Sequence, residues 1–96
     1  MAVLEENLGT GWEFPTRVLF RAPFEAVAPW VRPVMGRLEP AGDGCVLVGS
    51  TSNPAMYAGE WLANVPYDFE IEDGPELRAA VVRLAARFAA AVPPAG

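Results

Sequence analysis

Hydrophobic and polar residues alternate in two parts of the chain, which predicts two half-buried strands. In residues 16–22, Val18, Phe20 and Ala22 fall on one side, opposite two arginines and a leucine. Residues 67–72 alternate in the same way, with Phe69 and Ile71 opposite three carboxylates. Because successive side chains of a strand point to opposite faces of the sheet, each segment is expected to bury its apolar side.

Two further short apolar runs lie next to each other, at residues 36–40 and 44–51. The second run, Cys45 to Val48, has the composition of a buried strand. An Asp-Gly pair, Asp43-Gly44, is a strong signal for a tight turn. These runs therefore predict a β-hairpin.

Three segments show helical spacing of their apolar residues. Residues 24–35 repeat apolar side chains at intervals of three and four, but Pro29 and Pro33 fall inside the segment, so a kink or a break is expected. The pair Asn53-Pro54 predicts the start of a second helix that ends before Pro66. A last helix is expected after a capping box formed by Asp73 and Glu76. Its apolar stripe is Leu77, Val81, Leu84, Phe88 and Val92.

The predicted order of elements is strand, helix, strand, strand, helix, strand, with one more helix at the end. This order matches the α+β, ferredoxin-like βαββαβ arrangement, in which two helices cover one face of a four-stranded antiparallel sheet. We expect one such domain over residues 16–96. Residues 1–15 show no clear period and are interpreted as a linker or a remnant of an upstream part.

Composition narrows the possible chemistry of the 96-residue chain. It has no histidine and one cysteine, Cys45, so a histidine-based nucleophile, a disulfide framework and a thiolate metal cluster are not expected. Its glycines match no phosphate-binding or dinucleotide motif. We therefore expect no catalytic residue, no metal and no cofactor, and interpret Cys45 as an inert core thiol. The net charge of −5 disfavours binding to nucleic acid by this domain alone.

Arginines supply the candidate binding residues. In a ferredoxin-like sheet the first and last strands are neighbours, so Arg17 and Arg21 would lie beside Glu70 and Glu72, on the face away from the core. They could form exposed ion pairs there, or line a surface for a ligand or a partner.

Aromatic residues offer a second kind of candidate. Trp30 lies off the apolar stripe and between two prolines, which makes it a candidate for contact with another chain or domain. Tyr57 and Trp61, one helical turn apart, are expected to pack in the core.

Several segments together resemble a known family. They are the first strand from Thr16 to Phe20, the hairpin from Leu38 to Val48, the helix around Ala58-Gly59-Glu60-Trp61-Leu62, and the tail from Phe69 to Arg78 with its Pro-Glu-Leu-Arg helix start. In this order and spacing, residues 16–92 resemble the C-terminal extension (WCX) domain of bacterial WYL-domain transcriptional regulators.

The resemblance implies a regulatory domain for effector sensing, dimerisation and interdomain signalling. Its implied partners are upstream WYL and helix-turn-helix domains, which the 96 residues do not contain, and a second copy. A nucleotide or single-stranded nucleic acid is the implied effector, bound through the parent protein. Arg17, Arg21 and Arg37 are the candidates for contacting such an anionic effector, and Trp30 or Trp12 could stack on a base.

No apolar run reaches the roughly 20 residues needed to span a bilayer, and residues 1–10 do not have the pattern of a secretory signal, so we expect a cytoplasmic protein without membrane contact. The missing catalytic motifs predict that it is not an enzyme. Two alternatives remain: a stand-alone ferredoxin-like domain that binds a small molecule, and a small ferredoxin-like enzyme.

Overall fold

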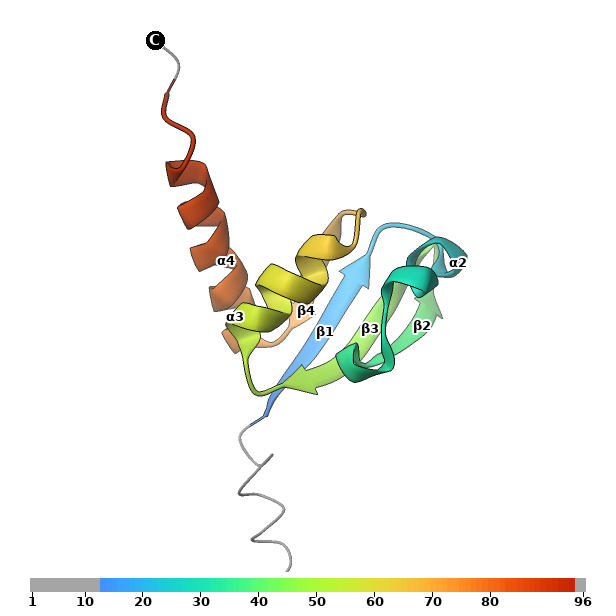
Figure 1. The fold of residues 1–96 in the computed structure, drawn as a ribbon. Helices are drawn as coiled ribbons and strands as arrows, with labels where there is room; N and C mark the ends of the chain where they lie inside the picture. Colours follow the sequence, from blue (N-terminus) through green and yellow to red (C-terminus); the bar gives the residue numbers. More distant parts are fainter. Residues whose placement is uncertain (1–12, 95–96) are drawn as a thin grey trace, which may run out of the picture.

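Four antiparallel strands form one sheet in the computed structural model, which describes residues 13–94 (Figure 1). The strands are β1 (Phe14–Phe20), β2 (Arg37–Ala41), β3 (Gly44–Thr51) and β4 (Phe69–Asp73). Their order is β2-β3-β1-β4, so β1 lies in the centre beside β3 and β4, while β2 and β4 form the edges. With two helical crossovers and an additional C-terminal helix, the structure confirms the predicted ferredoxin-like fold.

The hairpin turn lies one residue earlier than the sequence pattern suggested. Strands β2 and β3 are joined by Gly42 and Asp43, and Gly44 is already the first residue of β3. Gly42 has a φ of 60°, whereas Asp43 does not adopt a positive φ. A glycine with positive φ at the first central position is typical of a type II′ turn, so Gly42 rather than Gly44 makes the turn.

Both crossovers are built from short, irregular helical pieces. The first contains α2 (Phe24–Val27), η1 (Ala28–Trp30) and η2 (Pro33–Met35), so the predicted break at the prolines is confirmed. The second contains α3 (Pro54–Met56), η3 (Tyr57–Trp61) and η4 (Leu62–Asn64). Asn53 caps α3 as predicted, because its Oδ1 accepts a hydrogen bond from the Met56 amide at 3.1 Å.

The last helix, α4 (Pro75–Ala90), does not begin with the predicted capping box. Its N-cap is Gly74, which has a φ of 118°, and the Asp73 carboxylate accepts a hydrogen bond from the Gly74 amide at 2.9 Å. A side chain at Gly74 would place its Cβ 2.7 Å from the carbonyl oxygen of Pro15. Glycine is therefore required at this position, and it moves the start of the helix one residue beyond Asp73.

The core lies between one face of the sheet and the two crossovers (Figure 1). Val18 and Phe20 of β1 are fully buried there, and so is Tyr57, whose hydroxyl donates a hydrogen bond to the Met35 carbonyl at 2.7 Å. This bond links the second crossover to the first. No helix of the described residues packs on the opposite face of the sheet.

Only part of α4 packs on the domain, from Leu77 to Leu84. Leu77 and Ala80 are buried, but Phe88 is 57 % exposed. The predicted apolar stripe thus begins in the core and continues past its edge, where α4 leaves the body of the domain (Figure 1). No helix within residues 13–94 is long and apolar enough to cross a membrane.

Gly36, which follows η2, and Gly49, in β3, let the first crossover approach the sheet closely. An added Cβ on Gly49, in β3, would lie 2.6 Å from the Met35 carbonyl oxygen and 3.0 Å from the Cα of Gly36. Both contacts involve backbone atoms, which cannot move aside as a flexible side chain can. The seating of η2 on the sheet therefore requires the absence of a side chain at Gly49.

We predict that Gly49→Ala lowers the free energy of unfolding by about 1–3 kcal/mol or more, because the methyl group would push η2 away from β3. Gly59→Ala is the matched control, since its Cβ would lie 3.6 Å from a Leu84 methyl carbon, at ordinary contact distance. Urea denaturation followed by circular dichroism measures both variants. Equal stability of the two variants would contradict this account of the packing.

Candidate functional site

One face of the sheet is free of helices and collects most of the predicted site residues. Alternation along each strand and the strand register place the same set of side chains on it. We call this surface the open sheet face; it consists of Arg17, Leu19, Arg21, Arg37, Glu39, Val46, Val48, Glu70 and Glu72. The structure thus brings together three of the four predicted candidates, Arg17, Arg21 and Arg37.

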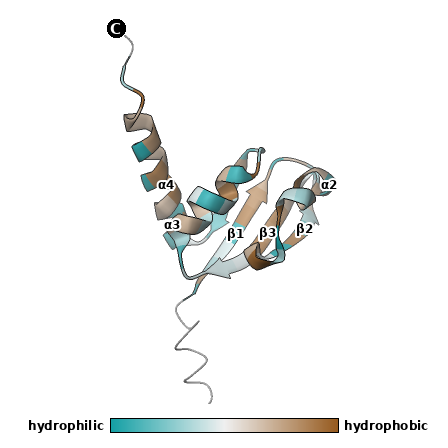
Figure 2. Cartoon of the chain, viewed as in Figure 1, coloured by the Kyte–Doolittle hydropathy of each residue, from teal (hydrophilic) through white to brown (hydrophobic). Residues whose placement is uncertain are grey.

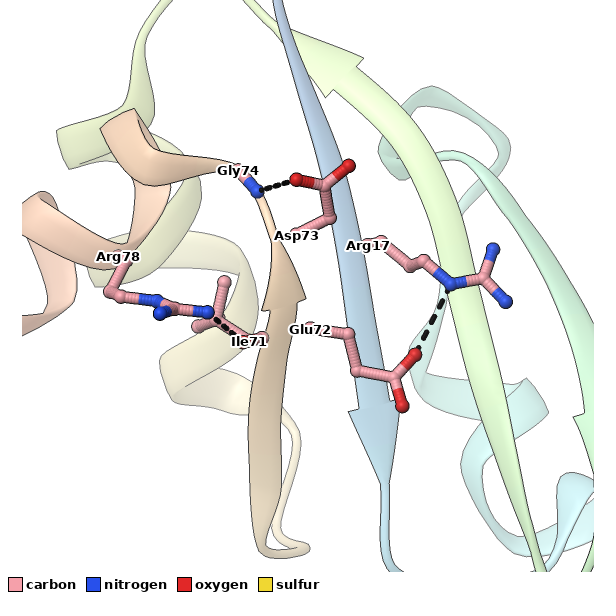
Figure 3. Close-up of polar contacts among 6 residues, drawn as sticks. All are labelled: Arg17, Ile71, Glu72, Asp73, Gly74 and Arg78. Carbon is pink, nitrogen blue, oxygen red and sulfur yellow. Dashed lines mark hydrogen bonds and ion pairs between the residues drawn. The ribbon is translucent and has the colours of Figure 1, made fainter.

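Each of these three arginines already has a carboxylate partner. Arg17 Nε lies 3.2 Å from Glu72 Oε1, across the β1–β4 pair (Figure 3). Arg21 forms an ion pair with Glu70, and Arg37 with Glu39. The side chains involved are 37–71 % exposed, so each pair contributes only about 0–1 kcal/mol. Arg17 and Arg21 therefore lie beside Glu70 and Glu72 as predicted, and they form ion pairs with these acids.

A small apolar centre lies between the ion pairs. Val46 is only 3 % exposed although no helix of the described residues covers it, because Leu19 of β1 and Glu39 of β2 are its neighbours in the register. Leu19 and Val48 are partly exposed beside it. Sequence reasoning did not identify this centre. The uninterrupted apolar run from Cys45 to Val48 carried the signal, because such a run is typical of strands that are buried on both faces.

Trp30, the fourth predicted candidate, lies elsewhere. It is 48 % exposed in η1, on the side of the sheet that the crossovers cover. There it borders a cleft of about 180 Å³, lined by Trp30, Arg32, Met35, Glu60, Trp61 and Asn64. The Arg32 guanidinium lies 5.8 Å from the centre of the Trp61 ring, which is a cation–π distance.

Trp61 belongs only partly to the core. Its ring contacts Tyr57 edge to face, with the ring centres 5.2 Å apart, while its other side borders the cleft. Core packing was predicted for both residues, and the structure confirms it fully for Tyr57 alone. Trp12, the other stacking candidate, lies outside the described residues.

Burial raises the pKa of two groups in the core, the Cys45 thiol and the Tyr57 phenol. Cys45 Sγ lies 3.5 Å from the Ala22 carbonyl oxygen, and burial, with a smaller effect of the Glu25 charge, raises the pKa of this thiol. A raised pKa keeps the thiol protonated and unreactive. Burial likewise raises the pKa of Tyr57. Residues 13–94 contain no cluster of three or more acidic or cysteine side chains able to hold a metal ion.

Comparison with known proteins finds no relative of this chain. No protein-family model matches the chain, and searches of curated proteins and of solved structures find no match either.

We predict that the alkaline stability of the protein depends on Tyr57. Above about pH 10, near the ordinary pKa of tyrosine, the unfolded chain loses the phenol proton while the folded chain retains it, so the free energy of unfolding falls. Tyr57→Phe should remove this decrease. At neutral pH the variant should have a free energy of unfolding about 1–3 kcal/mol lower than the wild type, because the Met35 carbonyl loses its hydrogen-bond donor.

The measurement is urea denaturation between about pH 8 and pH 11, a range that brackets the ordinary pKa of tyrosine. A Cys45→Ala background removes the thiol, which also ionises in this range. Parallel pH profiles for the protein with Tyr57 intact and for the Tyr57→Phe variant would contradict the prediction.

Proposed function

We propose that this chain is a non-catalytic assembly and sensing module, of the kind that forms the C-terminal extension of WYL-type transcriptional regulators. The ferredoxin-like fold with an additional C-terminal helix supports this proposal. The helix start at Pro75-Glu76-Leu77-Arg78 and the arginine-bearing first strand are part of the resemblance on which the proposal is based.

The observation that carries the proposal is the open sheet face. Its apolar centre, with Val46 inside and Leu19 and Val48 partly exposed, is framed by three arginine–carboxylate pairs. An apolar middle with a polar rim is the general composition of a protein–protein interface. Such a face suits contact with a second copy or with a neighbouring domain of the parent protein.

Charge favours association over anion binding at this face. An anionic effector would have to compete with Glu72 for Arg17 and with Glu70 for Arg21, and those carboxylates would remain nearby and repel it. The net charge of −5 acts in the same direction. We therefore assign the open sheet face to assembly, and DNA contact to other domains of the parent protein.

We predict that the chain self-associates through this face. Light scattering across a concentration series should give a mass that rises from one chain, 10.3 kDa, towards two. Leu19→Glu should keep the protein monomeric, because a carboxylate would be buried at the centre of the interface without a partner.

Val34→Glu is the matched control, since Val34 is 63 % exposed in η2, on the covered side of the sheet, and this variant should associate like the wild type. A wild-type mass of one chain at every concentration would contradict self-association and would point to an upstream domain as the partner of the face.

Small-molecule sensing is a second candidate function, supported by the Trp30 cleft. Trp30 offers an exposed ring, and Arg32 beside it has no carboxylate partner among residues 13–94. A planar base could stack on the indole while Arg32 contacts a phosphate. The cleft is smaller than the roughly 300–1,000 Å³ of typical ligand sites, so we rank this function second.

Tryptophan fluorescence titrations with nucleotides and short single strands test this function. We predict a saturable change that Trp30→Ala abolishes and that Arg17→Ala combined with Arg21→Ala leaves intact. Loss of binding in the double arginine variant alone would instead assign the effector to the open sheet face. No saturable change with any of these probes would contradict effector binding by the isolated module.

A further inference from the structure

The side chains of the open sheet face lie in rows that cross the four strands. One row, taken in the order β2, β3, β1, β4, consists of Arg37, Val48, Arg17 and Glu72. The next row, in the same order, consists of Glu39, Val46, Leu19 and Glu70. Every carboxylate of the open sheet face is therefore on an edge strand, and its apolar side chains are on the central strands β1 and β3, where Figure 2 shows hydrophobic positions.

Two copies that meet on the same face are related by a twofold axis that lies between their sheets. In aligned packing, stacked sheets keep their strands within about 30° of each other, so this axis runs nearly along the strands or nearly across them. An axis across the strands places each strand over the same strand of the second copy. An axis along the strands, between β1 and β3, instead places β1 over β3 and β4 over β2 of the second copy.

An axis across the strands brings like charges together. Strand β4 would lie over β4 of the second copy, and its two side chains on the open sheet face are the carboxylates of Glu70 and Glu72. Strand β1 would lie over β1, so that Arg17 would meet an arginine or Leu19 of the second copy. Like charges that face each other across an interface suppress association, so this arrangement is disfavoured.

An axis along the strands joins groups that complement each other. Leu19 of each copy faces Val46 of the other, so the apolar centre is buried against itself. Glu72 of each copy faces Arg37 of the other. Glu39 faces Glu70 across the axis, but each of these carboxylates already has an arginine partner in its own chain. The open sheet face is thus complementary to itself about this axis.

The contact between Arg37 and Glu72 is within reach in spite of the twist of the sheets. The angle of about 30° between stacked sheets shifts facing residues at the edges by a few ångströms, which two long side chains can span. The side chains of Arg37 and Glu72 are 71 % and 37 % exposed, so a second chain can contact both. Glu72 can keep its bond to Arg17 as well, because a carboxylate has two acceptor oxygens.

We propose that two copies pack face to face about an axis along their strands, with Arg37 of each copy paired to Glu72 of the other. This geometry rests on the self-association proposed above and specifies the residues that decide how the two copies are oriented. Leu19 and Val46 supply the apolar contact at the centre, and the two contacts between Arg37 and Glu72 fix the register at the rim.

A charge exchange between chains tests this pairing on the full 96-residue protein. Arg37→Glu makes both rim contacts acidic and Glu72→Arg makes both basic, so each variant alone should dimerise at least about fivefold more weakly than the wild type. In an equimolar mixture, both contacts of each mixed dimer again join opposite charges, so sedimentation equilibrium should recover about the wild-type affinity. Mixing leaves the charges within each chain unchanged, and the recovery therefore reports contacts between chains.

Arg21→Glu mixed with Glu70→Arg is the matched control. It makes the same changes in charge on the same face, at two residues that pair within one chain but do not face each other across the axis. This mixture should associate with an affinity between those of its two components.

Two outcomes would count against the geometry, and they separate it from the self-association on which it rests. A wild type that dimerises, together with an Arg37→Glu and Glu72→Arg mixture that binds no more tightly than its components, would overturn the geometry and leave the self-association in place. A wild type that stays monomeric at every concentration would overturn both.

Discussion

The fold depends on one buried layer, in which the apolar face of the sheet meets two crossovers that could not be stable alone. Neither crossover contains a regular helix of the dozen or more residues that isolated helices need, so tertiary packing must hold each in place. Tyr57 is central to that packing, because its ring is fully buried and its hydroxyl ties the second crossover to the Met35 carbonyl of the first. Gly49 allows η2 of the first crossover to approach strand β3 of the sheet closely.

This one-sided packing explains why the candidate site is so exposed. Because both crossovers lie on the same side of the sheet, the other side carries whatever side chains alternation assigns to it. Those side chains are arginines and glutamates around a small apolar centre. The open sheet face therefore results directly from the connectivity of the ferredoxin-like fold, and the strand register turns its charges into cross-strand pairs.

Much of this arrangement could be predicted from the sequence, because period-two alternation determines which strand residues share a face. Arg17 and Arg21 beside Glu70 and Glu72 followed from alternation and the expected strand order alone. The start of α4 could not be predicted in the same way, since Gly74 caps the helix with a positive φ at a place where the nearby Pro15 carbonyl leaves no room for a side chain. The Trp30 cleft also depends on tertiary packing, because η1 and η3 meet only in the folded chain.

The edges of the sheet limit how this module can aggregate or extend. Strand β2 carries Pro40, which has no backbone N–H to donate, and β4 is only five residues long, with carboxylates at Glu70, Glu72 and Asp73. Short, charged or proline-containing edge strands are poor templates for adding another strand. Continuous sheets running from one molecule to the next are therefore disfavoured, which leaves the open sheet face, rather than an edge, as the part of the sheet suited to contact with a partner.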